Sequence, residues 1–409
     1  MKRTGFVVAV WFAFYLLVLL SPQLRVLKGN SDFLDKYTAG QLLLSGQGRQ
    51  LYDIDVQKRA QSEILASLNS DVEFAGGLLI AIHPPFAALW YLPVVWLPYP
   101  IAVLASSVLG LSFFAAGIGR LVQFFRLQSE PDFERLVLFC LGFLPLLATL
   151  LQGQLTSIVC LFLTLAFVDL KRARDFRAGI WLALSLAKFQ TIPVFLFVLL
   201  LKKQWKALSG FLLGAACLGV VSLCAVGWEG CRAYLRLLSD MPGWVNLHGL
   251  NPLKAHCLRG QMFLLFYHRL PGLIPWATWI ANVAILVFLM RAWRGPWNAQ
   301  SPLFDLKFAT AILVGLLVAP QVNYHDLAFL LLPGLILFHH TGTAGFLRQS
   351  RIRLTLFLVG YPLQLLAFVG SSKFPLQFNV IGLLILGGLI VEELGRASDY
   401  REPALEAAP

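Results

Sequence analysis

The sequence predicts an all-α protein that crosses a membrane many times, because apolar residues are abundant, recur along the chain and are separated by short basic segments. Of its 409 residues, 58% are hydrophobic and only 13% are charged, and the mean hydropathy is +0.72. A soluble domain would carry about 25% charged residues. Leu-rich runs recur from Val7 to Glu392, which favours membrane helices over the alternating strands of a β-barrel.

Twelve apolar runs are as long as a membrane span, which needs about 17–25 residues, or approach that length. They are Phe6–Leu20, Pro100–Val122, Leu136–Leu151, Leu155–Leu170, Ala178–Ala187, Thr191–Leu201, Ala207–Gly227, Leu273–Met290, Leu306–Pro320, Leu327–Phe338, Leu354–Val369 and Phe378–Glu392. The first run follows Lys2 and Arg3, but no small-residue cleavage site follows it. We therefore expect a retained span and not a signal peptide.

The basic residues indicate the orientation, since Lys and Arg concentrate in cytoplasmic loops. With the N-terminus in the cytoplasm, basic clusters such as 171–177 and 202–206 stay inside, provided that Pro84–Pro98 does not cross the membrane. That segment is short, contains prolines, and carries aromatic residues suited to the membrane interface. These aromatic residues are Trp90, Tyr91, Trp96 and Tyr99.

We therefore predict one membrane domain over residues 1–396, with a first external loop over 22–99 that holds interfacial helices, and a short cytoplasmic tail over 397–409. Both termini would be cytoplasmic. The net charge of +12 comes largely from the loop clusters and does not indicate nucleic-acid binding. Cys231 and Cys257 share a predicted external loop, either as a disulfide or as two free thiols.

Asp32 is the first candidate for chemistry, because it begins the large external loop shortly after the first span. A carboxylate at the membrane surface can take a proton from a hydroxyl group as a general base. Ser31 or Asp32 could equally be the N-cap of a helix that starts at Phe33. The residues alone leave both roles open.

Two further candidates lie in segments that the same topology brings to the external side. Lys188 stands in Ala-Lys-Phe-Gln-Thr-Ile-Pro, between two half-length helices. A lysine in the middle of a straight span would cost about 2.5–3.5 kcal/mol, which favours a break there. Lys188 would bind a phosphate or extend to the interface. His325, in a turn with Asn323, Tyr324 and Asp326, would contact a phosphate or sugar, or be a solvated loop residue.

The remaining motifs are weaker. Asp53 and Asp55 have the D-x-D spacing of a divalent-metal site, but a turn and helix start is the favoured interpretation. His83, before two prolines, is at least as consistent with a surface turn as with a functional role. The sequence shows no P-loop, Rossmann fingerprint, zinc-ligand spacing or G-x-S-x-G elbow. ATP-driven proteins and hydrolases therefore find no support.

Taken in order, these segments resemble those of the bacterial polyprenol-phosphate-mannose-dependent mannosyltransferases, glycosyltransferase family 87. The resemblance covers roughly residues 5–340 and rests on Asp32-Phe33-x-x-x-Tyr37-x-Ala39, Leu43-x-x-Gly46, Leu51-Tyr52-Asp53, His83-Pro84-Pro85-Phe86, Leu92-Pro93 to Leu97-Pro98, Gln152-Gly153-Gln154, Lys188-Phe189-Gln190-x-x-Pro193 and Asn323-Tyr324-His325-Asp326. The chain departs from the family at His83, where an aromatic residue is common, and at Thr156, where asparagine is common.

The resemblance implies a GT-C-type bundle of about these twelve spans in the bacterial inner membrane, with its active site facing the periplasm or the exterior. It implies inverting transfer of a sugar from a polyprenyl-phosphate donor to a lipid or glycan acceptor, without a cofactor or obligatory metal. Asp32 would be the general base, and Lys188 and His325 would contact the donor phosphate. Candidate substrate contacts are Asp35, Tyr37, His83, Gln152, Gln154, Gln190, Asn323 and Tyr324.

Two other classes of protein remain open. A transporter or lipid flippase would explain the many spans and the broken helix at Lys188, but not the long acidic first loop. A non-catalytic membrane assembly factor with a decayed site would keep the same architecture.

Overall fold

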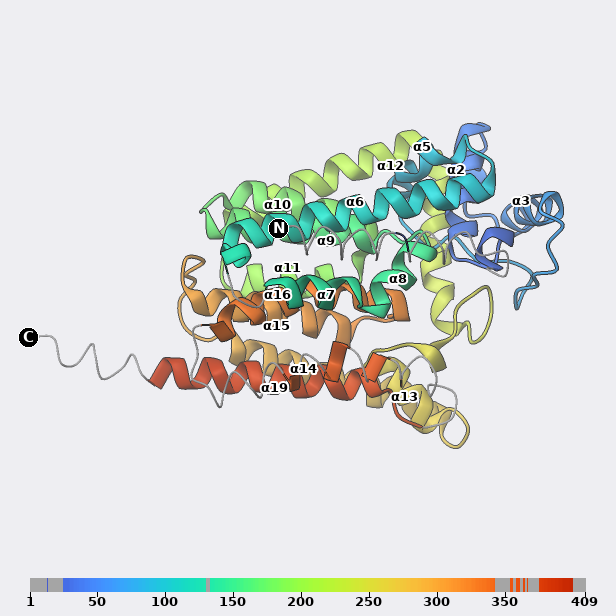
Figure 1. Ribbon diagram of the computed structural model, residues 1–409. Helices are drawn as coiled ribbons and strands as arrows, with labels where there is room; N and C mark the ends of the chain where they lie inside the picture. The colour runs from blue at the N-terminus through green and yellow to red at the C-terminus, as the bar shows by residue number, and fades with distance from the viewer. Residues whose placement is uncertain are drawn as a thin grey trace, which may run out of the picture.

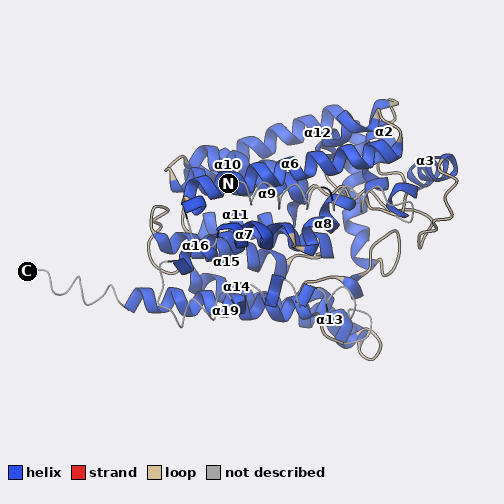
Figure 2. Ribbon diagram, in the orientation of Figure 1, coloured by secondary structure: helices blue, strands red, loops and turns tan. Residues whose placement is uncertain are grey.

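The computed structural model describes residues 13, 25–129, 133–342, 354–355, 358–360, 363–364, 366 and 375–399. Over this part of the chain the regular structure is entirely helical, as predicted (Figure 2). The predicted spans Phe6–Leu20 and Leu354–Val369 lie almost wholly outside the described residues, as does most of the predicted tail.

The predicted first external loop folds into short helices. They are α2 (Phe33–Leu44), α3 (Ile54–Ser67), α4 (Pro85–Ala88) and α5 (Leu92–Val95). The start of α3 agrees with the favoured interpretation of the D-x-D motif. The Asp53 carboxylate accepts hydrogen bonds from the backbone N–H groups of Asp55 at 2.9 Å and Val56 at 3.1 Å, so Asp53 is a helix cap.

The aromatic residues of Pro84–Pro98 do not all lie at a surface. Trp96 is 76% exposed, but Tyr91 and Tyr99 are only 5% and 4% exposed. The Tyr91 hydroxyl donates a hydrogen bond to the Gly153 carbonyl at 2.8 Å. Two of the four residues expected to form an interfacial belt are therefore buried inside the protein, where they anchor this segment. The placement of the segment itself at the membrane interface stays a prediction.

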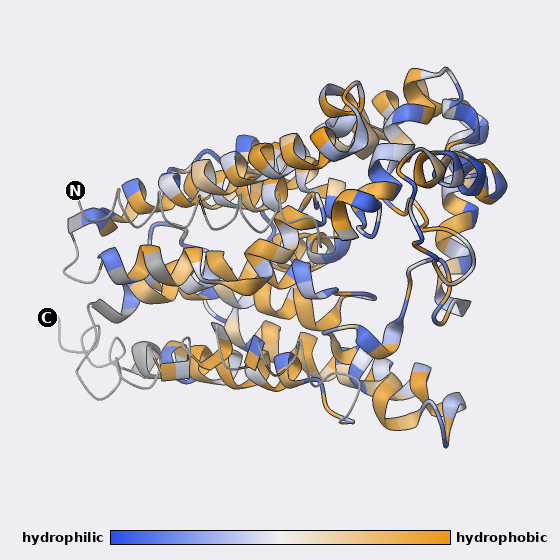
Figure 3. Ribbon diagram, turned by 45° about the vertical axis from the view of Figure 1, so that its right-hand side comes forward, coloured by the Kyte–Doolittle hydropathy of each residue, from blue (hydrophilic) through white to orange (hydrophobic). Residues whose placement is uncertain are grey.

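The helices of the rest of the chain follow. They are α6 (Tyr99–Phe125), α7 (Phe133–Leu141), α8 (Leu144–Leu151), α9 (Thr156–Lys171), α10 (Asp175–Leu184), α11 (Ile192–Leu201), α12 (Trp205–Asp240), α13 (Leu258–Phe266), α14 (Ile274–Ala292), α15 (Pro302–Val318), α16 (Leu331–Gly342) and α19 (Phe378–Asp399). Most of them lie side by side in one direction, with α2, α3 and α13 at one end (Figure 1). Hydrophobic residues run along these helices, whereas hydrophilic residues gather around the first-loop helices (Figure 3).

Among the described residues, five helical segments are long and apolar enough to cross a membrane. They are Tyr99–Phe125, Asp175–Leu201, Trp205–Gly243, Pro271–Ala292 and Phe378–Gly395. The pair α8 and α9 passes the same test together, but it is bent by 120° at its break. The predicted total of twelve spans is therefore not confirmed and stays a prediction.

The segment Asp175–Leu201 doubles back on itself. Gly179 in α10 packs against the backbone of Ala207 in α12, and Gly210 in α12 packs against the backbone of Phe176. The start of α10 thus lies beside the start of α12. Because α11 ends just before α12 begins, α11 returns to the end from which α10 started. The 3-10 turn Ser185–Thr191 (η5) joins the two, as the predicted pair of half-length helices requires.

One predicted span is wrong in its bounds. The run Leu136–Leu151 divides into α7 and α8 because Pro145 has no N–H to bond the Leu141 carbonyl, and α7 ends there. The run predicted to end at Gly227 does end there as a straight helix. Gly227, with φ +68° and ψ 178°, is not helical, and α12 joins two helices across a kink at this residue. Glycine adopts this conformation at little cost. The second of the two helices continues to Asp240 and takes the place of the beginning of the predicted loop.

One end of the bundle is basic. The Lys171 ammonium lies 2.6 Å from Asp305 near the start of α15, and Lys202 donates to the Gly295 carbonyl at 2.8 Å. The basic clusters 171–177, 202–206 and 291–294 therefore gather at this end. Helix α15 runs from here to the other end, where Gly315 packs against Thr191 of η5. Which compartment each end faces remains a prediction.

Candidate active site

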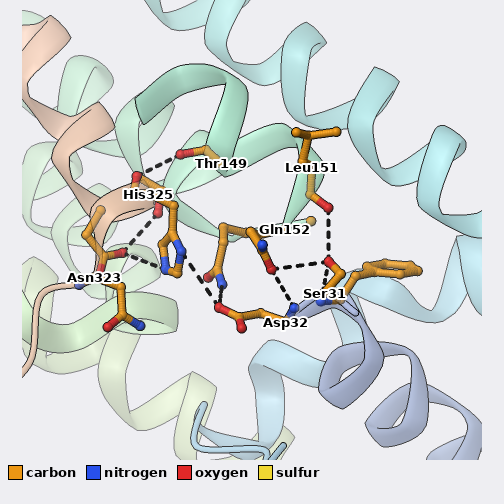
Figure 4. A network of polar contacts seen from close by, with 12 residues as sticks. Ser31, Asp32, Thr149, Leu151, Gln152, Asn323 and His325 are labelled. Carbon is orange, nitrogen blue, oxygen red and sulfur yellow. Dashed lines mark hydrogen bonds and ion pairs between the residues drawn. The ribbon is translucent and has the colours of Figure 1, made fainter. Parts of the chain in front are cut away.

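Four separate segments meet at the end of the bundle opposite the basic clusters, among them those that carry Asp32, Gln152 and His325 (Figure 4). They are the residues just before α2, the turn between α8 and α9, η5, and the 3-10 segment Tyr324–Leu330 (η9). Hydrogen bonds and ion pairs link all four. The structure thus brings together Asp32, Lys188 and His325, which the sequence places far apart.

Asp32 does not use its side chain as a helix cap. The Asp32 carboxylate makes no capping hydrogen bond, and the Phe33 N–H instead donates to the Ser31 hydroxyl at 3.2 Å. One Asp32 oxygen, Oδ2, accepts a hydrogen bond from the Gln154 amide at 2.8 Å. The other, Oδ1, has no hydrogen bond to any described residue, and the side chain is 35% exposed. The sequence left two roles open for Asp32, general base and helix cap, and the structure excludes the capping role for its side chain.

The turn between α8 and α9 positions Asp32. Gln152 accepts hydrogen bonds from the Asp32 N–H at 2.5 Å and from the Ser31 hydroxyl at 3.2 Å. Gly153 has φ +52°, and a β-carbon at that position would collide with the Phe33 ring. Glycine is thus required both for the backbone conformation and for the close approach of the turn to α2.

Lys188 is fully engaged with neighbouring groups. Its backbone leaves the helical region, with φ −137° and ψ 79°, and its side chain is 2% exposed. The ammonium group forms an ion pair with Asp326 and donates to Thr156 at 2.8 Å and to Gln154 at 3.1 Å. An ammonium has three hydrogens, so these three acceptors satisfy it. Gln154 consequently joins Lys188 to Asp32.

His325 lies between two carboxylates. Its Nδ1 is 3.7 Å from Asp32 Oδ2, and its Nε2 is 3.5 Å from Asp326 Oδ1. Burial lowers the pKa of His325 to about 4; Asp326 opposes this shift and Lys188 adds to it. The imidazole is therefore neutral at pH 7 and can donate from only one nitrogen.

A second buried pair lies beside Asp32 in α2. The Lys36 ammonium donates to the Asp32 carbonyl at 2.8 Å and to the Asp35 carboxylate at 2.9 Å. Burial raises the pKa of Asp35 to about 7, although the charge of Lys36 opposes the shift. The sequence prediction missed Lys36 and the role of Asp326. Lys36 follows Asp32 by four residues, which is the spacing of neighbours on one helix face.

A cavity of about 260 Å³ adjoins this network. Lys188, His83, Gln190 and Arg259 are among the residues that line it. The Gln190 side-chain oxygen is buried and has no hydrogen-bond partner among the described residues. Arg259, which the sequence prediction also missed, donates to the carbonyls of Pro320 and Pro242, both at 3.2 Å. These two bonds leave three of the five guanidinium hydrogens free.

An apolar groove of about 390 Å³ continues from the cavity. The two share Phe189 and Leu238. Other groove residues are Pro84, Pro85, Phe86, Leu186, Ala215, Leu218 and Leu235. The predicted aromatic segment Pro84–Pro98 therefore contributes its first residues to this groove.

The other predicted contacts are occupied by the protein itself. The Tyr37 hydroxyl donates to the Leu97 carbonyl at 2.8 Å, and the Tyr324 hydroxyl donates to the Gln364 carbonyl at 3.3 Å. The Asn323 side chain accepts from Gln321 at 2.9 Å. Cys231 and Cys257 are free thiols. Among the described residues, no cluster of His, Cys, Asp and Glu could hold a metal ion.

The fold and the site define a helical membrane protein with a partly exposed carboxylate beside a buried network of charged groups. Over residues 81–320 the sequence matches the profile of glycosyltransferase family 87. The match covers more than half of the chain, which therefore belongs to this family and is a membrane glycosyltransferase. The search of curated proteins and the search of solved structures each found no match. Because the chain belongs to this glycosyltransferase family, the transporter interpretation is not favoured.

Proposed function

We propose that the protein transfers a sugar, with mannose as the first choice, from a polyprenyl-phosphate donor to a lipid or glycan acceptor at the non-cytoplasmic face of the bacterial inner membrane. The observation that carries the proposal is the Asp32 carboxylate. One of its oxygens is held by Gln154, while the other has no hydrogen bond to a described residue and belongs to a side chain that is 35% exposed.

Asp32 acts as the general base of a single displacement. It takes the proton of an acceptor hydroxyl while that oxygen forms a bond to the anomeric carbon of the donor. The bond between the anomeric carbon and the phosphate oxygen breaks, and the polyprenyl phosphate leaves with the electron pair. Attack from the opposite face inverts the anomeric configuration. Gln152 and Gln154 keep the carboxylate in place during this step.

The donor phosphate binds in the cavity beside Lys188. Because its three hydrogens are already engaged, Lys188 supplies positive potential and not a direct hydrogen bond. His325 contributes a neutral donor at the boundary with Asp32. We assign the direct contact to Arg259, since its remaining hydrogens fit the oxygens of a phosphate. The unpaired Gln190 oxygen suits a sugar hydroxyl.

The lipid chain of the donor lies in the apolar groove. The groove begins where the cavity ends, at Phe189 and Leu238, so phosphate and chain occupy adjoining spaces of opposite character. An amphiphilic donor matches this division, whereas a nucleotide sugar would place charged groups along the whole path. This is the physical argument for a lipid-linked donor.

The substitution Asp32→Asn tests the proposal. With polyprenyl-phosphate mannose as the donor and a glycolipid extract as the source of acceptors, the purified variant should transfer sugar about 10²–10⁴ times more slowly than the wild type. Asp55→Asn, which changes an exposed carboxylate in the same loop, should leave the rate unchanged. Wild-type rates in the Asp32→Asn protein would show that Asp32 is not the base.

The side of the membrane needs its own test. A cysteine at Arg174, which is exposed at the basic end, should be shielded from an impermeant thiol reagent in intact cells and should react after the membrane is opened. Labelling in intact cells would place the basic end outside and reverse the proposed orientation.

A further inference from the structure

A second cavity, of about 560 Å³, lies at the basic end of the bundle. It is bounded by the end of α14, the connection to α15, the start of α15 and the end of α19. Helix α15 has 17 residues, so the two ends that it connects are about 25 Å apart. This cavity is therefore separate from the site around Asp32.

The charged side chains that line this cavity are all basic. They are Arg291, Arg294 and Lys307. The nearby acidic groups have other partners: Asp305 pairs with Lys171 at 2.6 Å, and Glu393 lies 3.4 Å from His340. Lys307 donates to the Arg294 carbonyl at 2.7 Å, which leaves two of its hydrogens free. The cavity therefore favours an anion.

Trp293 provides an independent indication of a ligand. Its side chain is 2% exposed, and its indole N–H is buried without a hydrogen-bond partner among the described residues. The ring stacks on Trp297, with centroids 5.6 Å apart, and meets Phe304 edge-on at 5.7 Å. The ring is thus fixed by packing, while its buried donor lacks the acceptor that such groups normally have.

The rest of the wall is apolar, and the cavity lies where two candidate spans end. Leu303, Val391 and Leu394 line it together with the aromatic rings. The candidate spans Pro271–Ala292 and Phe378–Gly395 both end here. Charged lipid headgroups lie at this level of a membrane, beside the ends of spans, and basic pockets between spans bind anionic headgroups.

We propose that this cavity binds an anionic phospholipid, whose phosphate accepts hydrogen bonds from the Trp293 indole and the basic side chains while its acyl chain lies between α14 and α19. Of the apolar stretch in the candidate span Pro271–Ala292, only 11% is buried within the protein. A lipid in this position would therefore supply packing between α14 and α19 and stabilise the fold.

Thermal unfolding of the purified full-length protein in a neutral detergent tests the proposal. Phosphatidylglycerol should raise the melting temperature by several degrees, whereas phosphatidylcholine with the same acyl chains should not. Inorganic phosphate at equal ionic strength should have no effect. Equal stabilisation by phosphatidylcholine would show that headgroup charge is irrelevant, and stabilisation by phosphate alone would identify a free-anion site in place of a lipid site.

Variants locate the site. The double substitution Arg294→Gln and Lys307→Gln should weaken phosphatidylglycerol binding at least about tenfold, measured by native mass spectrometry. The matched control, Arg174→Gln and Lys206→Gln, removes two exposed charges from the same end and should bind as the wild type does. Equal binding by both double variants would overturn the proposal.

Trp293→Phe supplies a second measurement that leaves the charges untouched. It removes the indole N–H while an aromatic ring remains to pack against Trp297 and Phe304. We expect binding to weaken severalfold with the preference for an anionic headgroup retained. This variant tests the site even if the double variant fails to fold. Unchanged binding would show that the indole does not meet the headgroup.

Discussion

Removing one member of the buried pair Lys188 and Asp326 should destabilise the protein far more than removing both. Lys188 is 2% exposed and Asp326 is 3% exposed. Lys188→Met would leave the Asp326 carboxylate with three uncharged neighbours: the Asn323 N–H at 2.8 Å, the Thr156 hydroxyl at 3.4 Å and His325 Nε2 at 3.5 Å. Breaking a buried pair in this way costs about 3–5 kcal/mol, because one charge stays buried without its partner.

Asp326→Asn should cost a similar amount, since the Lys188 ammonium would then face only neutral acceptors. The double variant removes both charges, and we expect it to be no less stable than either single variant. The sum of the two single effects would then exceed the double effect by about 3 kcal/mol or more.

Unfolding of the purified variants, followed by tryptophan fluorescence during titration with a denaturing detergent, measures these differences without an activity assay. A double variant whose loss equals the sum of the two single losses would show that the charges are not coupled, and the description of this pair would be wrong.

Three further predictions concern stability. Burial raises the pKa of Asp35 from 3.8 to about 7, so the folded state binds this proton more tightly than the unfolded state does. The protonated carboxyl therefore stabilises the folded protein. This contribution is fully present below about pH 4 and is lost as the pH rises through 7. Asp35→Asn should remove up to about 1.4 kcal/mol per pH unit of this slope. His325 contributes a pH dependence of opposite sign, but it does so equally in the wild type and in Asp35→Asn. The difference between the unfolding free energies of the two proteins from pH 4 to 8 therefore isolates Asp35. Parallel curves would refute the raised pKa of Asp35. Asp53→Ala should cost α3 about 1 kcal/mol and Asp53→Asn much less, measured by amide hydrogen exchange; equal exchange in both would contradict the cap. Gly179→Ala should lower the melting temperature because its β-carbon meets the α12 backbone, whereas Gly219→Ala, with open space around it, should not; equal melting temperatures would argue against this contact.

The sequence was sufficient to predict the helical membrane class and the position of several site residues. Lys188 could be placed at a break because a charge within a straight span is costly and a proline follows five residues later. Asp32 and His325 could be assigned to the same side because the basic clusters between spans constrain their orientation. These predictions use properties that are local in the chain or depend on counting spans.

The partners of these residues could not be predicted. Asp326 was recognised only as a polar neighbour of His325, because nothing in the sequence shows that it meets Lys188 across the bundle. Arg259 lies in a loop whose path depends on the unpredicted second helix of α12, which runs from Gly227 to Asp240. Burial of Tyr91 and Tyr99 was missed for a similar reason: a short aromatic segment has the same composition at a lipid interface and against a protein core.

The amide of Gln154 gives the network a direction. Lys188 can only donate, so the Gln154 oxygen must face it, and the amide N–H group must therefore face Asp32. Donors thus point from Lys188 through Gln154 to the carboxylate, and the polarity at Asp32 is determined by a lysine that it does not touch. Glutamate at position 154 would have nearly the same shape but would set two acceptors face to face, so size and geometry alone do not specify this position.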